Sequence, residues 1–265
     1  MHDLRAVRLQ KIKNIVERDG VVSISDLSKG FDKTPITIRR DLLLLEEEGL
    51  VRRTYGGAIL VTSRKDESGN IEEPDPYDIR ETEHLDEKMA IAEAAAKLIK
   101  DGDSLILNAG TTVHELAILL KKRRELQIVT NGLTVASALV GCVDSNILMI
   151  GGEVDFKKMG TVGPVAEDSL ENIHVSKAFL GVTGISVTRG ITMHSQTEAR
   201  INAKFVQSAD EVTVLVDSSK FEAHSLFKIS DLSSLDRIIT DSGITDKTRE
   251  ALEASGVELI VVDCN

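Results

Sequence analysis

The chain has 265 residues, 42% of them hydrophobic, which is enough for a sizeable core and favours two domains over one. It has no apolar run long enough to span a bilayer and no secretory signal, so we expect no membrane partner. The scattered His residues and the two cysteines, Cys142 and Cys264, form neither a metal site nor a disulfide framework. We therefore expect a cytoplasmic protein with no metal and no cofactor.

The net charge of −11 is unevenly distributed along the chain. Residues 1–65 carry 13 Lys and Arg against 9 Asp and Glu, a balance of +4. Residues 66–265 carry 19 against 34, a balance of −15. A basic head ahead of an acidic body suggests that only the head meets the phosphates of a nucleic acid.

The first fifty residues predict three helices. Residues 4–18 have apolar positions on one helical face, and the helix ends at Asp19-Gly20. A short β-branched run, 21–24, precedes a brief helix over 25–31, and a third helix begins after Thr34. This succession is typical of a helix-turn-helix.

The third helix has clear start and stop signals. Thr34 is an N-cap candidate, and Pro35 suits the first helical position because its missing N–H would be unpaired there anyway. Gly49 is well placed to end the helix. Its apolar positions recur at i, i+4 and i+7 and are Ile38, Leu42 and Leu45.

The charges of this helix favour a base-reading role, because such helices present their N-terminal residues to base edges. Its cations stand near that end and Glu46–Glu48 near the other, although an ordinary amphipathic helix with a charged outer face remains an alternative. Residues 50–60 then form two extended runs around Gly56-Gly57, a hairpin typical of a wing. Arg52 and Arg53 on the wing are expected to contact phosphates. The expected DNA-binding residues are Pro35, Thr37, Arg39, Arg40, Arg52, Arg53 and Tyr55.

Residues 62–82 are polar, rich in helix breakers and nearly free of apolar side chains, which is typical of a linker. We expect a winged helix-turn-helix domain over residues 1–61 and an α/β domain over 83–265. The second domain alternates apolar runs with helical segments, a pattern that predicts a doubly wound, mostly parallel sheet. The expected strands lie at 105–107, 128–129, 147–150, 178–180, 212–216, 237–239 and 259–262, with helices at 88–99, 112–121, 133–140, 197–208 and 246–254.

Small, polar and glycine residues follow the strands, where open α/β sheets hold their ligands. Ala109–Thr112 also opens a helix, so its N–H groups, hydroxyls and dipole suit a phosphate, and Lys220 adds a point charge. Glycine turns alone would be expected after strands in any such fold. The expected effector-binding residues are Asn108, Ala109, Gly110, Thr111, Thr112, Thr130, Asn131, Gly132, Gly151, Gly152, Glu153, Gly184 and Lys220.

Several longer motifs carry a family resemblance. They are Thr37-Ile38-Arg39-Arg40-Asp41-Leu42, Arg53-Thr54-Tyr55-Gly56-Gly57-Ala58, Glu87-Lys88-Met89-Ala90-Ile91-Ala92, Gly110-Thr111-Thr112, Phe179-Leu180-Gly181-Val182-Thr183-Gly184-Ile185 and Asp217-Ser218-Ser219-Lys220-Phe221. Together they resemble the DeoR family of bacterial transcription regulators over nearly the whole chain apart from the linker. The resemblance implies a winged helix that reads operator DNA and an effector domain similar to ribose-5-phosphate isomerase. It also implies repression of a sugar-catabolism operon and release by a small phosphorylated sugar.

Two segments depart from the family pattern. Asn108 stands where the family usually has Asp, so a carboxylate contact to a sugar hydroxyl would become an amide contact. The segment 193–200 differs from the usual Pro/Asp-rich version. Both departures leave the identity of the ligand open.

Two other functions stay open beside a regulator. An isomerase or related transferase would need a carboxylate base beside the phosphate, which Asp217 or Glu153 would have to supply. A protein-interaction module that no longer binds DNA is disfavoured by the retained arginines. We expect a regulator and not an enzyme. Because operators of this class pair half-sites, we also expect a homo-oligomer, at least a dimer, held by the acidic body.

Overall fold

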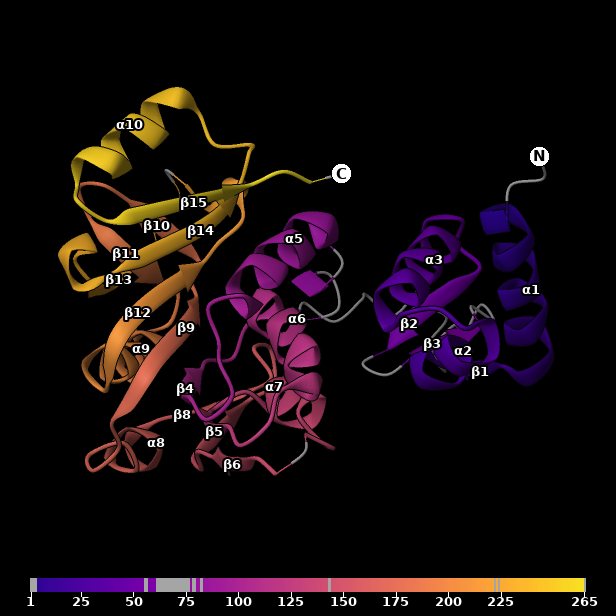
Figure 1. Cartoon of the computed structure of the whole chain (residues 1–265), viewed down its shortest axis with the longest axis horizontal. Helices are drawn as coiled ribbons and strands as arrows, with labels where there is room; N and C mark the ends of the chain where they lie inside the picture. Colours follow the sequence, from indigo (N-terminus) through magenta and orange to yellow (C-terminus); the bar gives the residue numbers. More distant parts are fainter. Residues whose placement is uncertain are drawn as a thin grey trace, which may run out of the picture. The chain divides into compact units, whose positions relative to one another are not determined.

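The computed structural model describes residues 4–54, 57–60, 77, 80–81, 83–142, 144–221, 223 and 225–264. The chain divides into two compact units, residues 1–82 and 83–265, shown in Figure 1. The expected wing residue Tyr55 and most of the expected linker, 62–82, lie outside the described residues. None of the helices in the described part is both long and apolar enough to cross a membrane.

The first unit is a winged helix-turn-helix, as the sequence predicts. Its elements are α1 (Leu4–Asp19), β1 (Val21–Ser23), α2 (Ile24–Phe31), α3 (Pro35–Glu47), β2 (Val51–Thr54) and β3 (Gly57–Leu60). The three strands form one antiparallel sheet in the order β1-β3-β2. The β2–β3 hairpin is the wing, and α2 and α3 form the helix-turn-helix.

The helix α3 begins and ends where its sequence signals predict. The Thr37 N–H donates to Thr34 Oγ1 at 3.3 Å, and Pro35 occupies the first turn. At the other end Gly49 has a φ of +72°, and the Leu50 N–H reaches back to the Leu45 carbonyl at 2.9 Å. Its expected apolar stripe is at most 2% exposed and comprises Ile38, Leu42 and Leu45.

A buried ion pair joins α1 to α3. The Asp41 side chain is 1% exposed and accepts from Arg8 Nη2 at 3.0 Å, while Arg5 Nε lies 3.6 Å from the same carboxylate. A buried carboxylate without such partners would cost several kcal/mol. This pair therefore holds α3 in one orientation on α1.

Gly57 allows β3 to approach β1 closely. A Cβ at this position would lie 1.7 Å from the Val22 carbonyl oxygen, a backbone atom that cannot turn away. Gly57 pairs with Ser23, which is also the N-cap of α2. The same glycine therefore joins the wing to the start of the helix-turn-helix.

We expect Gly57→Ala to destabilise the first unit by about 1–3 kcal/mol, because the added methyl overlaps backbone. Hydrogen exchange of peptides from β1, α2 and β3 in the full chain should show the loss of protection. Gly30→Ala in α2 is the matched control: no atom lies within 4 Å of the added Cβ, and alanine favours helix. Equal protection in the two variants would contradict this account.

The second unit is built on a seven-stranded sheet in which all neighbouring strands are parallel. From one edge to the other the strands are β15 (Glu258–Val262), β14 (Arg237–Asp241), β12 (Ala209–Leu215), β9 (Val175–Gly181), β4 (Ser104–Leu107), β5 (Gln127–Thr130) and β6 (Asn146–Met149). Each contains an apolar run that the sequence assigned to a strand, so the expected parallel sheet is confirmed.

Helices cover both faces of this sheet, because successive strand residues point to opposite sides. Leu105 and Leu107 pack with α5 (Leu85–Ala96), α6 (Thr111–Leu119) and α7 (Leu133–Ala138). Ile106, between them, packs in the opposite core with α8 (Pro164–Asp168), α9 (Gln196–Gln207) and α10 (Asp246–Ala254). Figure 1 shows α5 to α7 on one side of the sheet and α9 on the other. The doubly wound arrangement is confirmed.

Two small antiparallel sheets were missed by the sequence prediction. One is the hairpin β7 (Glu153–Asp155) and β8 (Gly160–Val162). The other contains β10 (Gly184–Ser186), β11 (Gly190–Met193) and β13 (Phe227–Ser230). Their strands of three or four residues are too short to show a clear apolar run or alternation.

The strand order reverses at β4. From β4 the chain adds β5 and β6 on one side, and later β9, β12, β14 and β15 on the other. The crevice beyond the carboxyl ends of β4 and β9 is therefore the topological switch point, where open α/β sheets bind ligands.

Candidate functional site

The start of α3 carries the expected base-reading side chains, and they differ in exposure. Pro35 is exposed, and Thr37 and Arg40 are half-buried. Arg39 is only 8% exposed. Thr37 and Arg40 therefore remain the candidates for base contacts, and we leave Arg39 out of the proposed contacts.

One of the two wing arginines is bonded within the first unit. Arg53 is 7% exposed, and its Nε donates to Glu46 Oε2 at 3.1 Å while its N–H donates to Glu46 Oε1 at 2.8 Å. It thus ties β2 to the end of α3, and we leave it out of the phosphate contacts that the sequence predicted. Arg52 lies in β2, where its backbone pairs with Ile59.

In the second unit, Asn108 bridges the two strands of the switch point. Its side-chain Nδ2 donates to the Gly181 carbonyl at 2.8 Å, and its Oδ1 accepts the Gly181 N–H at 2.8 Å. Nδ2 also donates to Asn202 Oδ1 at 2.7 Å. Both amide hydrogens are used inside the protein, so Asn108 organises the site and is not in a position to donate to a ligand.

The loops after β4 and β5 are joined by Asn131, which is 3% exposed. Its Oδ1 accepts the Ala109 N–H at 2.9 Å, and its Nδ2 donates to the Thr161 carbonyl at 2.8 Å. Thr130 Oγ1 accepts the Gly132 N–H at 3.0 Å. These contacts bring the expected residues after β4 and β5 together with the β7–β8 hairpin.

The helix that follows β4 begins without a side-chain cap. Its N-cap residue is Gly110, and no side chain accepts from the first N–H groups of α6. Side chains cap α2, α3 and α10, at Ser23, Thr34 and Thr245, whereas α5, α7, α8 and α9 begin without one, as α6 does. The first turn of a helix has N–H groups without intrahelical partners and a positive dipole end, so this end of α6, with Thr111 and Thr112, suits an anion.

Two lysines add positive charge near the end of β12. Lys220 is half-buried in a single 3-10 turn, Ser218–Lys220. Lys88, from α5, is 4% exposed and donates to the Glu83 carbonyl. Burial lowers the pKa of Lys88 to about 8, the nearby Asp217 carboxylate raises it, and Lys220 lowers it. Lys88 and Lys220 therefore share one electrostatic environment, to which a bound anion would be attracted.

The remaining expected ligand residues are less closely tied to this point. Gly151, Gly152 and Glu153 are exposed and lead into β7. Gly152 has a φ of +143°, which side chains disfavour. Gly184 is buried, and a Cβ there would lie 2.4 Å from the Ala223 carbonyl. Its role is close backbone approach, so we leave it out of the proposed ligand contacts.

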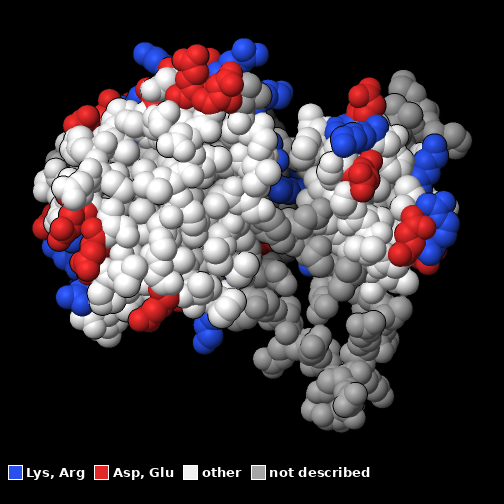
Figure 2. Space-filling view, turned by 90° about the horizontal axis from the view of Figure 1, so that it is seen from below, with Lys and Arg blue, Asp and Glu red and all other residues white. Residues whose placement is uncertain are grey.

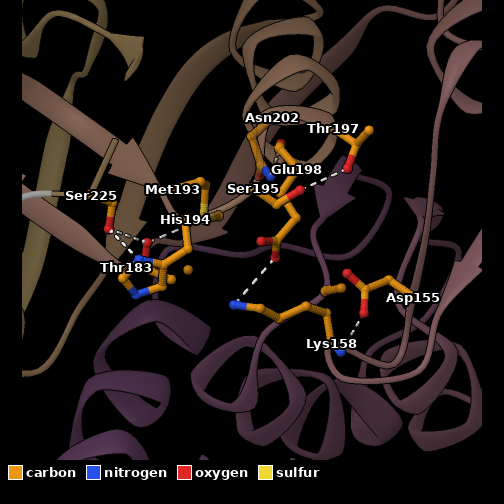
Figure 3. A network of polar contacts seen from close by, with 12 residues as sticks. Asp155, Lys158, Thr183, Met193, His194, Ser195, Thr197, Glu198, Asn202 and Ser225 are labelled. Carbon is orange, nitrogen blue, oxygen red and sulfur yellow. Dashed lines mark hydrogen bonds and ion pairs between the residues drawn. The ribbon is translucent and has the colours of Figure 1, made fainter. Parts of the chain in front are cut away.

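A further polar network lies around the start of α9, and Figure 3 shows it at close range. Lys158, from the β7–β8 turn, lies 3.4 Å from Glu198 Oε1 in the first turn of α9. His194 Nδ1 is 3.2 Å from Ser225 Oγ, which lies 2.9 Å from Thr183 Oγ1. The sequence predicted no site residue in this network, although segment 193–200 departs from the family pattern. The signal that could have indicated it is Glu198 in the first turn of α9, after the two non-helical residues His194 and Ser195.

The arrangement is suited to binding an anion. It offers an uncapped helix start, two lysines and internally bonded amides. Within the described ranges, no group of three or more His, Cys, Asp or Glu residues could hold a metal ion.

Known proteins match the chain in structure and in sequence. The solved structure of ribose 5-phosphate isomerase A from Methanocaldococcus jannaschii is 19% identical, and the match covers 51% of this chain and 53% of that one. The TM-score of this match is 0.37. The DeoR-like helix-turn-helix domain model matches residues 8–64, and the DeoR C-terminal sensor domain model matches residues 83–242.

Curated relatives are similar over nearly their whole length. The HTH-type transcriptional regulator GlpR of Haloferax volcanii is 32% identical, with 97% of this chain and 98% of the relative covered. The lactose phosphotransferase system repressor of Lactococcus lactis is 35% identical, covering 92% and 93%. The glycerol-3-phosphate regulon repressor of Escherichia coli K12 is 32% identical, covering 87% and 88%. With a winged helix-turn-helix, a doubly wound second unit and these matches, the chain belongs to the DeoR family of transcriptional regulators.

Proposed function

We propose that this protein represses a sugar-catabolism operon and releases its operator when a small phosphorylated sugar binds the second unit. Two observations support the ligand. The start of α6, at the switch point, has no side-chain cap, and Lys88 and Lys220 lie close enough to each other after β12 to interact electrostatically. The names of the relatives, which include repressors of lactose transport and of glycerol-3-phosphate genes, support the operon class. As an operator-binding protein it would act in the cytoplasm, where we expected it.

The proposed DNA contacts separate base reading from backbone binding. Thr37 and Arg40, near the start of α3, would face base edges in the major groove. Arg52 on the wing would contact a phosphate and so add affinity without sequence preference.

We expect Arg40→Ala to weaken specific operator binding by about 1–3 kcal/mol while leaving random DNA nearly unaffected. Arg52→Ala should weaken both DNAs equally and reduce the salt dependence, because it removes one released counterion. Fluorescence anisotropy with operator and random duplexes at several salt concentrations measures both effects. Lys247→Ala, an exposed lysine in the second unit, is the control. Equal loss on both DNAs for Arg40→Ala would make Arg40 a phosphate contact.

The proposed phosphate site consists of the α6 start and Lys220. The Gly110 backbone is extended, with a φ of −176°, and the atom nearest to an added Cβ is 3.7 Å away. A side chain there is therefore tolerated, and an Asp would place its carboxylate at the helix start as a cap.

We expect Gly110→Asp to abolish binding of the sugar phosphate without lowering the melting temperature, because its carboxylate occupies the anion site. Lys220→Ala should lower affinity by about 10- to 100-fold, the loss of one charge-assisted contact worth about 1.5–3 kcal/mol. Operator affinity without ligand should stay at the wild-type value in Lys220→Ala. A melting-shift panel of phosphorylated sugars, followed by titration of the operator complex, tests this. Wild-type responses in both folded variants would place the phosphate elsewhere.

We also propose that the protein is at least a dimer, assembled through the second unit. Several exposed large apolar side chains belong to β6, β7, α8 or the segments next to them. They are 42–73% exposed and comprise Val140, Leu148, Val154, Phe156 and Val165. Figure 2 views the molecule from below Figure 1, the side on which β6 and α8 lie, and its broad surface there has few charged side chains. Exposed large apolar side chains on a surface with few charges are typical of an interface.

Light scattering at micromolar concentration should give a mass of at least about twice the 28.9 kDa of one chain. Val165→Asp should shift the protein toward the monomer, because it buries a charge in the proposed interface. Leu226→Asp, at another exposed apolar residue, is the control. A wild-type monomer, with and without operator DNA, would contradict the proposal.

The enzyme alternative has less support from the site. Asn108, at the position where a carboxylate base was sought, has both amide hydrogens bonded internally. Asp217 is buried and accepts the Ser219 N–H at 3.1 Å. Glu153 is exposed at the start of the β7–β8 hairpin. Asp217 is thus committed to an internal hydrogen bond and Glu153 faces solvent, whereas a general base needs a free carboxylate oxygen within reach of the substrate.

A further inference from the structure

Glu198 combines deep burial with an unused oxygen. Its side chain is 9% exposed, and only Oε1 lies near a cation, Lys158 Nζ at 3.4 Å. Glu198 Oε2 is buried and has no hydrogen-bond partner among the described residues. An unsatisfied acceptor of this kind costs about 1–3 kcal/mol, more if it is charged, so it calls for a partner that binds there.

The position of Glu198 relates it to the proposed phosphate site. The Glu198 carbonyl accepts from Asn202 Nδ2 at 2.8 Å, and Asn202 Oδ1 accepts from Asn108. Asn108 stands two residues before Gly110, the N-cap of α6. Two successive hydrogen bonds and a two-residue stretch of chain thus connect the start of α9 to the start of α6.

The surroundings of Glu198 indicate what kind of group it would accept from. In Figure 3 its carboxylate and the Lys158 side chain point toward one another, with His194 to one side and Asp155 to the other. Lys158 already balances the negative charge, so a second cation would be repelled by the ammonium. A neutral donor, such as a hydroxyl group, would satisfy Oε2 without adding charge.

We propose that Glu198 is the residue that selects the sugar, by accepting a hydrogen bond at Oε2 from one hydroxyl of the effector, with Lys158 holding its carboxylate in place. This inference rests on the proposed function, since it assumes a phosphorylated sugar at the switch point. Glu198 would recognise the sugar end, and the α6 start with Lys220 the phosphate end. A site built to hydrogen-bond a hydroxyl strongly rejects analogues that lack it.

The test uses the full chain, isothermal titration with a panel of sugar phosphates and their single-deoxy analogues, and inorganic phosphate as a separate probe. Glu198→Gln should bind the preferred sugar phosphate about 10- to 100-fold more weakly and inorganic phosphate as wild type does. One deoxy analogue should bind wild type more weakly than its parent does, and Glu198→Gln should bind the two equally. Glu167→Gln, which alters another ion pair to α9 through Arg200, is the matched control and should bind as wild type.

The outcomes separate the inference from the proposed function. If Glu198→Gln binds every sugar phosphate like wild type, or loses inorganic phosphate in equal measure, Glu198 does not select the sugar. The proposed function is then still intact. If the wild-type protein distinguishes no sugar phosphate from inorganic phosphate, the proposed function fails, and the inference fails with it.

Discussion

The second unit depends on the side-chain amide of Asn108, which joins the carboxyl ends of β4 and β9 where the strand order reverses. A neutral amide is needed, because the group accepts from the Gly181 N–H and donates to the Gly181 carbonyl and to Asn202. An Asp, which the family resemblance leads one to expect here, has no hydrogen to donate when ionised. Asn202 could turn its own amide to compensate only by withdrawing the donor from the Glu198 carbonyl. The amide of Asn108 therefore fixes the orientation of the Asn202 amide, which in turn bonds the Glu198 carbonyl.

The fold could be predicted from the sequence where apolar residues decide it. Strands such as Leu105–Leu107 are buried on both faces and read as continuous apolar runs, and α3 is delimited by Thr34, Pro35 and Gly49. The small sheets could not be predicted in this way. The β7–β8 hairpin is stabilised by contacts such as Asn131 to Thr161, between residues 30 positions apart, which leave no local pattern.

The sequence indicates where on the fold the candidate sites lie, but not which side chains are free to bind a ligand or DNA. Glycine and polar residues after the strands indicated the carboxyl edge, and the structure brings Ala109, Asn131 and the α6 start together there. The sequence does not reveal which polar side chains are already used internally. From the sequence, Arg39 and Arg53 were expected to bind DNA like the arginines next to them. Both are buried in the structure. The contact between Lys158 and Glu198 could not be predicted from the sequence, because the two residues meet only through the folded β7–β8 hairpin and α9.

The bare start of α6 has a consequence for the lifetime of the protein. A helix with glycine at its N-cap is less stable than one with a Ser, Thr, Asn or Asp cap by about a few tenths of a kcal/mol, and a bound phosphate would supply the missing acceptors. Ligand that binds only the folded state adds stability in proportion to the logarithm of its concentration. Where proteolysis acts on transiently unfolded chains, the regulator would persist longer when its sugar is abundant and be cleared faster when it is scarce. The effector would then set the amount of regulator in the cell as well as its occupancy of DNA.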